Sequence, residues 1–321
     1  MNPLGVLGLI LLLSLLGTVA GLATGLVPGI HVNNVALLVL AASPAILGSL
    51  EASVGGEGVL LLAAFLVAAS AAHGMSSLLP SVFLGAPDED TALSVLPGHR
   101  LLVQGRGYEA VLLAARGALL ATFLAIPMLL PFRLLLGSPV NGYAKLRPVL
   151  PLVLLLLVVL LVAMEGRSSE EPSRRLRKRA WAVGLLLLAG LLGWIVLRPG
   201  VLEDAWVPVP VAGGSLILFP LFTGLFGLPT LLMAARTRGR LPPQILGPAD
   251  PLPDWRRTRA VLSGTLAGAA VSWFPGLGGS NATVVAQLLA GGEPQEDPDA
   301  DREFLLAAGA ASASSRSRRC S

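Results

Sequence analysis

Two segments near opposite ends of the chain combine a helix-breaking Pro-Gly pair with small polar residues. They are Val27–Asn34 (VPGIHVNN) and Phe274–Asn281 (FPGLGGSN). Proline removes a backbone donor and glycine tolerates positive φ, so an apolar helix has to break at each pair. A helix that resumes after the break presents free N–H groups and about half a positive charge, which suits an anion such as a carboxylate. The chemistry that these residues favour is therefore binding of a small anion.

A broken backbone inside a membrane survives only where it is buried in protein or lines a wet cavity, and paired breaks mark the substrate sites of secondary transporters. A competing interpretation is that each Pro-Gly pair only kinks a transmembrane helix and that the two Asn residues join helices. The serines of the set could equally bond to helix carbonyls. On the first interpretation, the predicted substrate-binding residues are Pro28, Gly29, His31, Asn33, Asn34, Ser76, Ser77, Pro275, Gly276, Gly278, Gly279, Ser280 and Asn281.

An acidic cluster, Asp88, Glu89 and Asp90, follows a Gly-Ala-Pro turn. Acids at the start of a helix commonly interact with its dipole, which is one interpretation of the cluster. Ionisable groups inside a membrane are costly and usually functional. If the cluster faces the cavity, we expect Asp88 and Asp90 to couple substrate binding to a cation or a proton.

Metal and cofactor chemistry finds little support in the sequence. The three histidines, His31, His73 and His99, are too few and too scattered for a metal site. Cys320 is the single cysteine, which excludes disulfides, cysteine-based zinc sites and iron–sulfur clusters within one chain. We therefore predict no catalytic residue, no metal site and no cofactor.

The composition places these residues in a membrane. Of 321 residues, 54% are hydrophobic and 13% charged, with a mean hydropathy of +0.76, whereas soluble domains carry about 25% charged residues. Few aromatic residues with 37 Gly and 25 Pro disfavour a β-barrel and favour tightly packed, broken helices. The net charge of +4 comes from basic loops and is not a nucleic-acid signal. The sequence thus predicts an all-α polytopic protein of the cell membrane.

Seven apolar stretches are long enough, or nearly so, to span a bilayer: 4–23, 58–72, 109–130, 149–164, 181–197, 211–234 and 260–274. Interrupted pieces at 28–47, 73–98 and 276–291 are expected to be half-helices or re-entrant hairpins. The basic loops 165–180 and 236–259 should face the cytoplasm and 198–210 the outside, while the side of the N-terminus stays open.

An internal repeat relates the two Pro-Gly segments. Residues 17–36 and 264–283 align without gaps, with eight of twenty positions identical, including both Pro-Gly pairs. We expect two related repeats, inverted relative to each other, each with a Pro-Gly-broken helix. The expected organisation is a first repeat at 1–135, connecting helices at 136–258 and a second repeat at 259–321. The polar end of the chain, with its arginines at 316, 318 and 319, indicates that the second repeat is truncated.

At Val27–His31, Phe274–Gly279 and His73–His99 the chain resembles the large membrane subunit of the tripartite tricarboxylate transporter family, the TctA-like permeases, in an archaeal-type branch. The resemblance covers most of residues 5–312. It implies a permease for small organic anions, such as carboxylates, driven by an ion gradient. It also implies a small membrane subunit and an extracytoplasmic binding protein as partners. The alternative is a membrane-embedded enzyme that uses Asp88–Asp90 on a lipid-linked substrate.

Overall fold

The computed structural model confirms the predicted all-α polytopic class. It describes residues 3–30, 32–86, 90–165, 171–197, 220–221, 224–225, 228–236, 241–247, 251–274, 277–290 and 299–317, and within these ranges every regular element is a helix. Among these described residues, four helical segments are long and apolar enough to cross a bilayer: Leu4–Gly25, Gly58–Phe83, Gly107–Leu136 and Pro172–Val196. The chain forms two compact units, one of Met1–Leu129 with Leu218–Ser321 and one of Leu130–Ile217.

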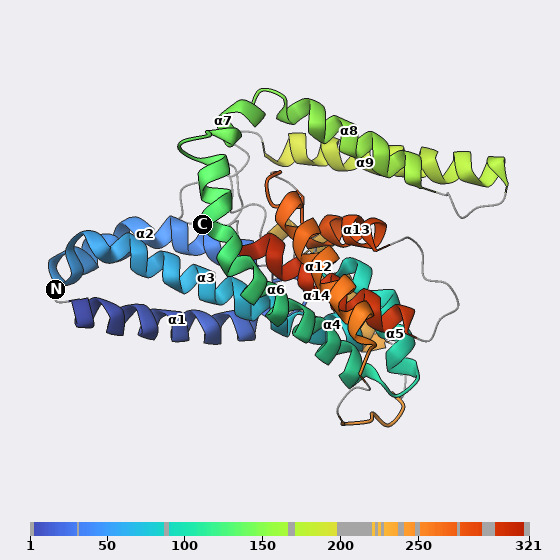
Figure 1. Cartoon of the computed structure of the whole chain (residues 1–321), viewed down its shortest axis with the longest axis horizontal. Coiled ribbons are helices and arrows are strands. Elements are labelled where there is room, and N and C mark those ends of the chain that lie inside the picture. The colour runs from blue at the N-terminus through green and yellow to red at the C-terminus, as the bar shows by residue number, and fades with distance from the viewer. Residues whose placement is uncertain are drawn as a thin grey trace. The chain divides into compact units, whose positions relative to one another are not determined.

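The first unit begins with two helices that pack side by side through glycine. Gly17 and Gly21 of α1 lie so close to α3 that a Cβ at either position would be 2.2 Å from a carbonyl oxygen, of Phe65 and Ala69 respectively. Because sequence order is kept across the contact, α1 and α3 run parallel. Helix α2, which connects them in sequence, runs back along the other side of α3 (Figure 1). The helices of this half are α1 (Pro3–Gly25), α2 (Val32–Val54), η1 (Gly55–Glu57), α3 (Gly58–Ser76) and α4 (Leu78–Phe83).

The same packing recurs in the second half. Gly264 and Gly268 of α12 (Asp254–Val271) would place a Cβ 2.4 Å from the carbonyl oxygens of Ala307 and Ala311 in α14 (Ala300–Ser317). The short helix α13 (Gly279–Leu289) lies between them in sequence. These glycines are the ones that the repeat alignment pairs with Gly17 and Gly21, so Phe65 and Ala69 of the first half correspond to Ala307 and Ala311.

The two sets of helices run in opposite directions. One buried apolar cluster contains Val82 at the end of α4 together with Ala110, Ala260 and Leu305, which lie near the starts of α6, α12 and α14. Helices α3 and α4 therefore run toward this cluster, and α12 and α14 run away from it, as Figure 1 also shows. This direction matches the inverted relation expected from the sequence. The remaining helices of the first unit are η2 (Ala92–Ser94), α5 (Val95–Val103), the first part of α6 (Gly107–Leu136) and α11 (Leu228–Arg236).

The segment after the first Pro-Gly turn differs from its predicted form. Residues 28–47 were expected to hold a half-helix, whereas α2 is 23 residues long and includes Pro44. At 1.5 Å per residue such a helix is about 35 Å long, enough to cross a hydrocarbon core. Past Pro44 the helix continues for ten residues to Val54, through a stretch that is apolar except for Ser49, Glu51 and Ser53.

The second unit contains α7 (Gly142–Leu146), α8 (Leu150–Met164) and α9 (Pro172–Val196). The basic stretch predicted as a loop at 165–180 is helical from Pro172 onward. Proline at the first helical position is pre-organised for a helix start. Arg179 also donates to the carbonyl oxygens of Ala163 (2.5 Å) and Glu165 (3.3 Å), the last carbonyls of α8, so a basic side chain from α9 caps its neighbour.

Candidate functional site

The first Pro-Gly turn breaks the chain between α1 and α2. Helix α1 ends at Gly25, α2 begins at Val32, and Gly29 between them has φ of +89°. This backbone conformation is open to glycine and strained for a β-branched residue, which is the physical reason for Gly29. Pro28 and Gly29 are half-buried. His31 and the side chains of Asn33 and Asn34 lie outside the described residues.

The second turn leads into α13. Helix α12 ends at Val271, Pro275 and Gly276 lie outside the described residues, and α13 begins at Gly279 after an extended Gly278. Ser280 and Asn281 belong to the first turn of α13. Its free N–H groups thus begin at the predicted position.

A carboxylate from the other half of the unit occupies this helix start. The N–H of Gly279 donates to Oδ1 of Asp90 at 2.5 Å, and Asp90 is 6% exposed. A Cβ at position 279 would lie 2.8 Å from that oxygen and 3.0 Å from Oγ of Ser312, so the contact requires glycine. The negative charge of Asp90 meets the positive end of the α13 dipole. One interpretation of the sequence was that the acidic cluster interacts with the dipole of the helix that follows it. Asp90 instead contacts the start of α13, 189 positions further along the chain. Asp88 lies outside the described residues.

A cavity of about 270 Å³ adjoins this contact. Its walls come from α3, the start of α4, α6, α14 and residues 90–94, and most of them are small or apolar side chains. The residue correspondence set by the glycine contacts pairs Ser70 with Ser312 and Ala71 with Ala313, so equivalent positions of the two halves face the same cavity. The polar side chains in the lining are Ser70, Asp90, Thr91, Ser94, Thr122 and Ser312.

Two of the predicted serines lie outside the cavity lining. The hydroxyl of Ser76 is within hydrogen-bond distance of three backbone carbonyls, including that of Gly21 in α1 at 3.3 Å, and the hydroxyl of Ser77 donates to Gly74 at 3.4 Å. Nδ1 of His73 lies 3.1 Å from Oγ1 of Thr24, again between α3 and α1. The contacts of Ser76 and His73 join α1 to α3, and that of Ser77 is a local bond to a carbonyl of α3. Bonds of this kind are what the alternative interpretation of the serines expects. A role in substrate binding for Ser76 and Ser77 stays a prediction.

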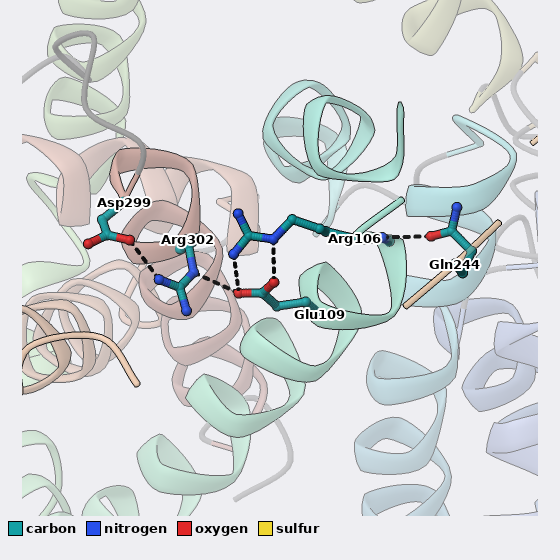
Figure 2. Close-up of polar contacts among 6 residues, drawn as sticks. Arg106, Glu109, Gln244, Asp299 and Arg302 are labelled. Carbon is teal, nitrogen blue, oxygen red and sulfur yellow. Dashed lines mark hydrogen bonds and ion pairs between the residues drawn. The ribbon is translucent and has the colours of Figure 1, made fainter. Parts of the chain in front are cut away.

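Charged residues join the starts of α6 and α14 on one side of the cavity (Figure 2). Glu109 accepts two hydrogen bonds from Arg106, at 2.7 and 2.9 Å, and one from Arg302 at 2.7 Å. Burial disfavours the charged form of Arg302, but hydrogen bonds to Asp299 and Glu109 outweigh it and raise the pKa of the guanidinium. Next to Arg106, the backbone N–H of Gly107 donates a hydrogen bond to Oε1 of Gln244 at 2.8 Å. The network is charge-balanced within itself and holds the two helix starts together.

Between this network and the cavity, α6 and α14 touch through glycine. A Cβ at Gly117 would lie 2.0 Å from the carbonyl oxygen of Leu306, and one at Gly309 would lie 2.0 Å from that of Ala114. Gly309 is also part of the cavity wall. The backbones are therefore in contact at this level, which leaves no room for a ligand between them.

Ser70 and Ser94 of the cavity were missed in the sequence. The signal that identifies one pair is the tetrapeptide Ala-Ala-Ser-Ala, present at 68–71 and again at 310–313. The connection from the broken helix to this tetrapeptide is shorter in the second half than in the first, so the ungapped alignment of the turns does not extend to it. No repeated sequence pattern of this kind identifies Ser94.

Comparison with known proteins gives the family. The chain matches the Tripartite tricarboxylate transporter TctA family over residues 11–317. It is 30% identical over 228 residues to an uncharacterized protein of Methanocaldococcus jannaschii, covering 71% of this chain and 49% of that protein. The chain therefore spans about half the length of this curated relative. No solved structure matches the chain.

The matching family is a transporter family, and the match gives no support to the alternative of a membrane-embedded enzyme acting on a lipid-linked substrate. The archaeal relative is consistent with the archaeal-type branch inferred from the turns. The chain belongs to the TctA family of tripartite tricarboxylate transporters.

Proposed function

We propose that the protein is the permease component of a transporter for small organic anions of the carboxylate class, and that the substrate binds where the two repeats meet. The observation that carries the proposal is the contact between Asp90 and the N–H of Gly279 at the wall of the cavity. It marks the start of α13 as a position that accepts a carboxylate. The two Pro-Gly turns and Gly278–Asn281 keep their predicted roles as the two halves of this site.

Asp90 sets a condition on anion binding. The start of α13 offers about half a positive charge, which compensates one carboxylate and not two. Two carboxylates about 5 Å apart repel each other by roughly 3 kcal/mol at an effective dielectric constant of 20. A substrate carboxylate at this helix start therefore requires that Asp90 be neutralised, and we assign that task to the coupling cation. A role for Asp88 beside it stays a prediction from the sequence.

The family supplies the setting of the proposal. We place the protein in the cell membrane as a multi-pass protein, with its two basic segments on the cytoplasmic side. The name of the family refers to a tripartite transporter, and we expect a small membrane subunit and an extracytoplasmic binding protein as the other two components. The binding protein would deliver the anion to the cavity.

Binding to the purified chain tests the proposal without requiring the partner subunits. Equilibrium binding of radiolabelled carboxylates is measured in sodium chloride and in choline chloride, each over a range of pH. We expect binding that depends on sodium ions or on protons. In Asp90→Asn the amide oxygen still accepts from Gly279 but the charge is gone, so binding should persist and lose that dependence.

The matched control is Asp254→Asn. This carboxylate is exposed and pairs only with Arg257 among the described contacts, at 2.7 Å. The control should keep the cation or proton dependence of the wild type. Absence of carboxylate binding under every condition would refute the proposed function, and an unchanged dependence in Asp90→Asn would refute the role of Asp90.

A further inference from the structure

Two serine hydroxyls face the cavity without a hydrogen-bond partner in the described part of the chain. Ser70 of α3 is 9% exposed and Ser94 of η2 is 4% exposed, and both line the cavity. Neither hydroxyl oxygen is among the buried side-chain atoms without a partner, so both are open to the cavity that the residues line. A ligand in the cavity can therefore bond to them.

The lack of a local bond at Ser70 is informative because a helix always offers one. A helical serine can donate to the carbonyl three or four residues earlier. Ser263 and Ser272 do so in α12 and at its end, at 3.2 and 2.8 Å. Ser70 has the same option in α3 and its hydroxyl makes no such bond. Its hydroxyl is therefore available to a group in the cavity.

The surroundings of the two hydroxyls define the chemistry that they fit. Asp90 lines the same cavity, so the wall near them carries negative charge. Side chains such as Val67, Met75 and Leu78 make much of the remaining wall apolar. A hydroxyl pair in this setting suits a neutral polar group, while a further carboxylate would lose its hydration and find no cationic side chain among the residues that line the cavity. The volume of about 270 Å³ suits a small molecule, since pockets for drug-sized ligands measure about 300–1,000 Å³.

We propose that Ser70 and Ser94 bind the neutral polar end of a small monocarboxylate, such as a hydroxy or oxo acid, whose single carboxylate lies at the start of α13. This inference rests on the proposed function and narrows its substrate class. The two hydroxyls act as specificity-determining residues. They donate to, or accept from, the substrate hydroxyl or carbonyl group, and the apolar wall covers the carbon skeleton.

Isothermal titration of the purified chain with four probes tests the inference. Lactate carries one carboxylate and a hydroxyl, propionate lacks the hydroxyl, and malate and citrate add carboxylates. We expect lactate to bind about tenfold more tightly than propionate, the effect of one or two hydrogen bonds, and more tightly than malate or citrate. In Ser70→Ala/Ser94→Ala the affinity for lactate should fall to that for propionate, which itself should not change.

The control variant is Ser263→Ala, which removes a buried hydroxyl outside the cavity lining and should leave the affinity for lactate unchanged. If carboxylates bind but lactate and propionate bind equally, or malate or citrate binds more tightly than lactate, the inference is wrong and the proposed function stands. If no carboxylate binds, the proposed function fails and the inference with it. The comparison of probes on the wild type keeps the inference falsifiable even if the double variant does not fold.

Discussion

Replacing Gly309 by alanine should destabilise the protein because of one backbone contact. In α14 this glycine faces α6 so closely that a Cβ would lie 2.0 Å from the carbonyl oxygen of Ala114 and 2.7 Å from its carbon. Ordinary van der Waals contacts of a Cβ begin at 3.4 Å. The atoms that it meets are backbone, which no rotamer change can move. Helices α6 and α14 would have to separate by roughly 1 Å or more.

The expected magnitude is the difference of two terms. Overpacking in a tight core costs typically about 1–3 kcal/mol, and contact with backbone places this case at the upper end. Alanine in a helix regains about 1 kcal/mol over glycine. We therefore expect Gly309→Ala to lower the free energy of unfolding by about 2 kcal/mol. Separation of the helices would also lengthen the bond between Glu109 and Arg302, which acts in the same direction.

The assay is reversible unfolding of the purified protein in mixed detergent micelles, followed by circular dichroism. Gly190→Ala in α9 is the matched control because nothing lies within 4 Å of a Cβ at that position. Only helix propensity acts there, so the control should be more stable than the wild type by about 0.5–1 kcal/mol. A Gly309→Ala protein as stable as the wild type, or more so, would refute the close contact between α6 and α14.

Three further predictions address the network, the first turn and the topology. Glu109→Gln removes the carboxylate charge that pairs with both Arg106 and Arg302, so it should destabilise by about 3 kcal/mol in the same assay, whereas Asp254→Asn at an exposed pair should stay within about 0.5 kcal/mol. Gly29→Val places a β-branched residue at φ of +89° and should abolish carboxylate binding while membrane insertion persists; unchanged binding would contradict the site. A cysteine at Ser173 should be shielded from impermeant thiol reagents in intact cells and one at Asp204 should react; the opposite pattern would reverse the orientation.

The features that the sequence predicted are those with a local cause. Pro28-Gly29 breaks the helix because the residue types forbid continuation, and Gly29 has the positive φ that glycine permits. The repeated glycines, Gly17 with Gly21 and Gly264 with Gly268, are visible in the alignment because their spacing of four residues places both on one helix face. The structure shows that the first pair packs against α3 and the second pair against α14.

The partner of Asp90 could not be predicted from the sequence. A carboxylate just before a short helical stretch is most simply explained by the helix that follows it, and the sequence offered that explanation. Asp90 instead meets Gly279, far along the chain. Such a contact depends on how the two halves pack, and the residues next to Asp90 in sequence do not identify a partner so far along the chain. The segment boundaries at 135 and 258 stay predictions for the same reason.

The basic residues at the start of α9 illustrate a different limit. Charge predicts that they lie outside the apolar span, because charged side chains are costly in hydrocarbon. Charge does not say whether a segment is a loop or a helix, and arginine and lysine are good helix formers. With Pro172 at the first position, the helix begins before the apolar stretch and carries the basic residues in its first turns.

The contact between Asp90 and Gly279 links ligand binding to the packing of the two halves. Asp90 belongs to the half that runs toward the shared apolar cluster, and α13 belongs to the half that runs away from it. An anion that takes the N–H of Gly279 has to displace Asp90, and this breaks a hydrogen bond that joins the two halves. A cation that neutralises Asp90 weakens the same bond. Under the proposed function, the substrate and the coupling ion therefore weaken the same hydrogen bond: the substrate binds its donor, the N–H of Gly279, and the ion binds its acceptor, Asp90. A ligand shifts an equilibrium only by its differential affinity for two states, and this contact provides such a difference.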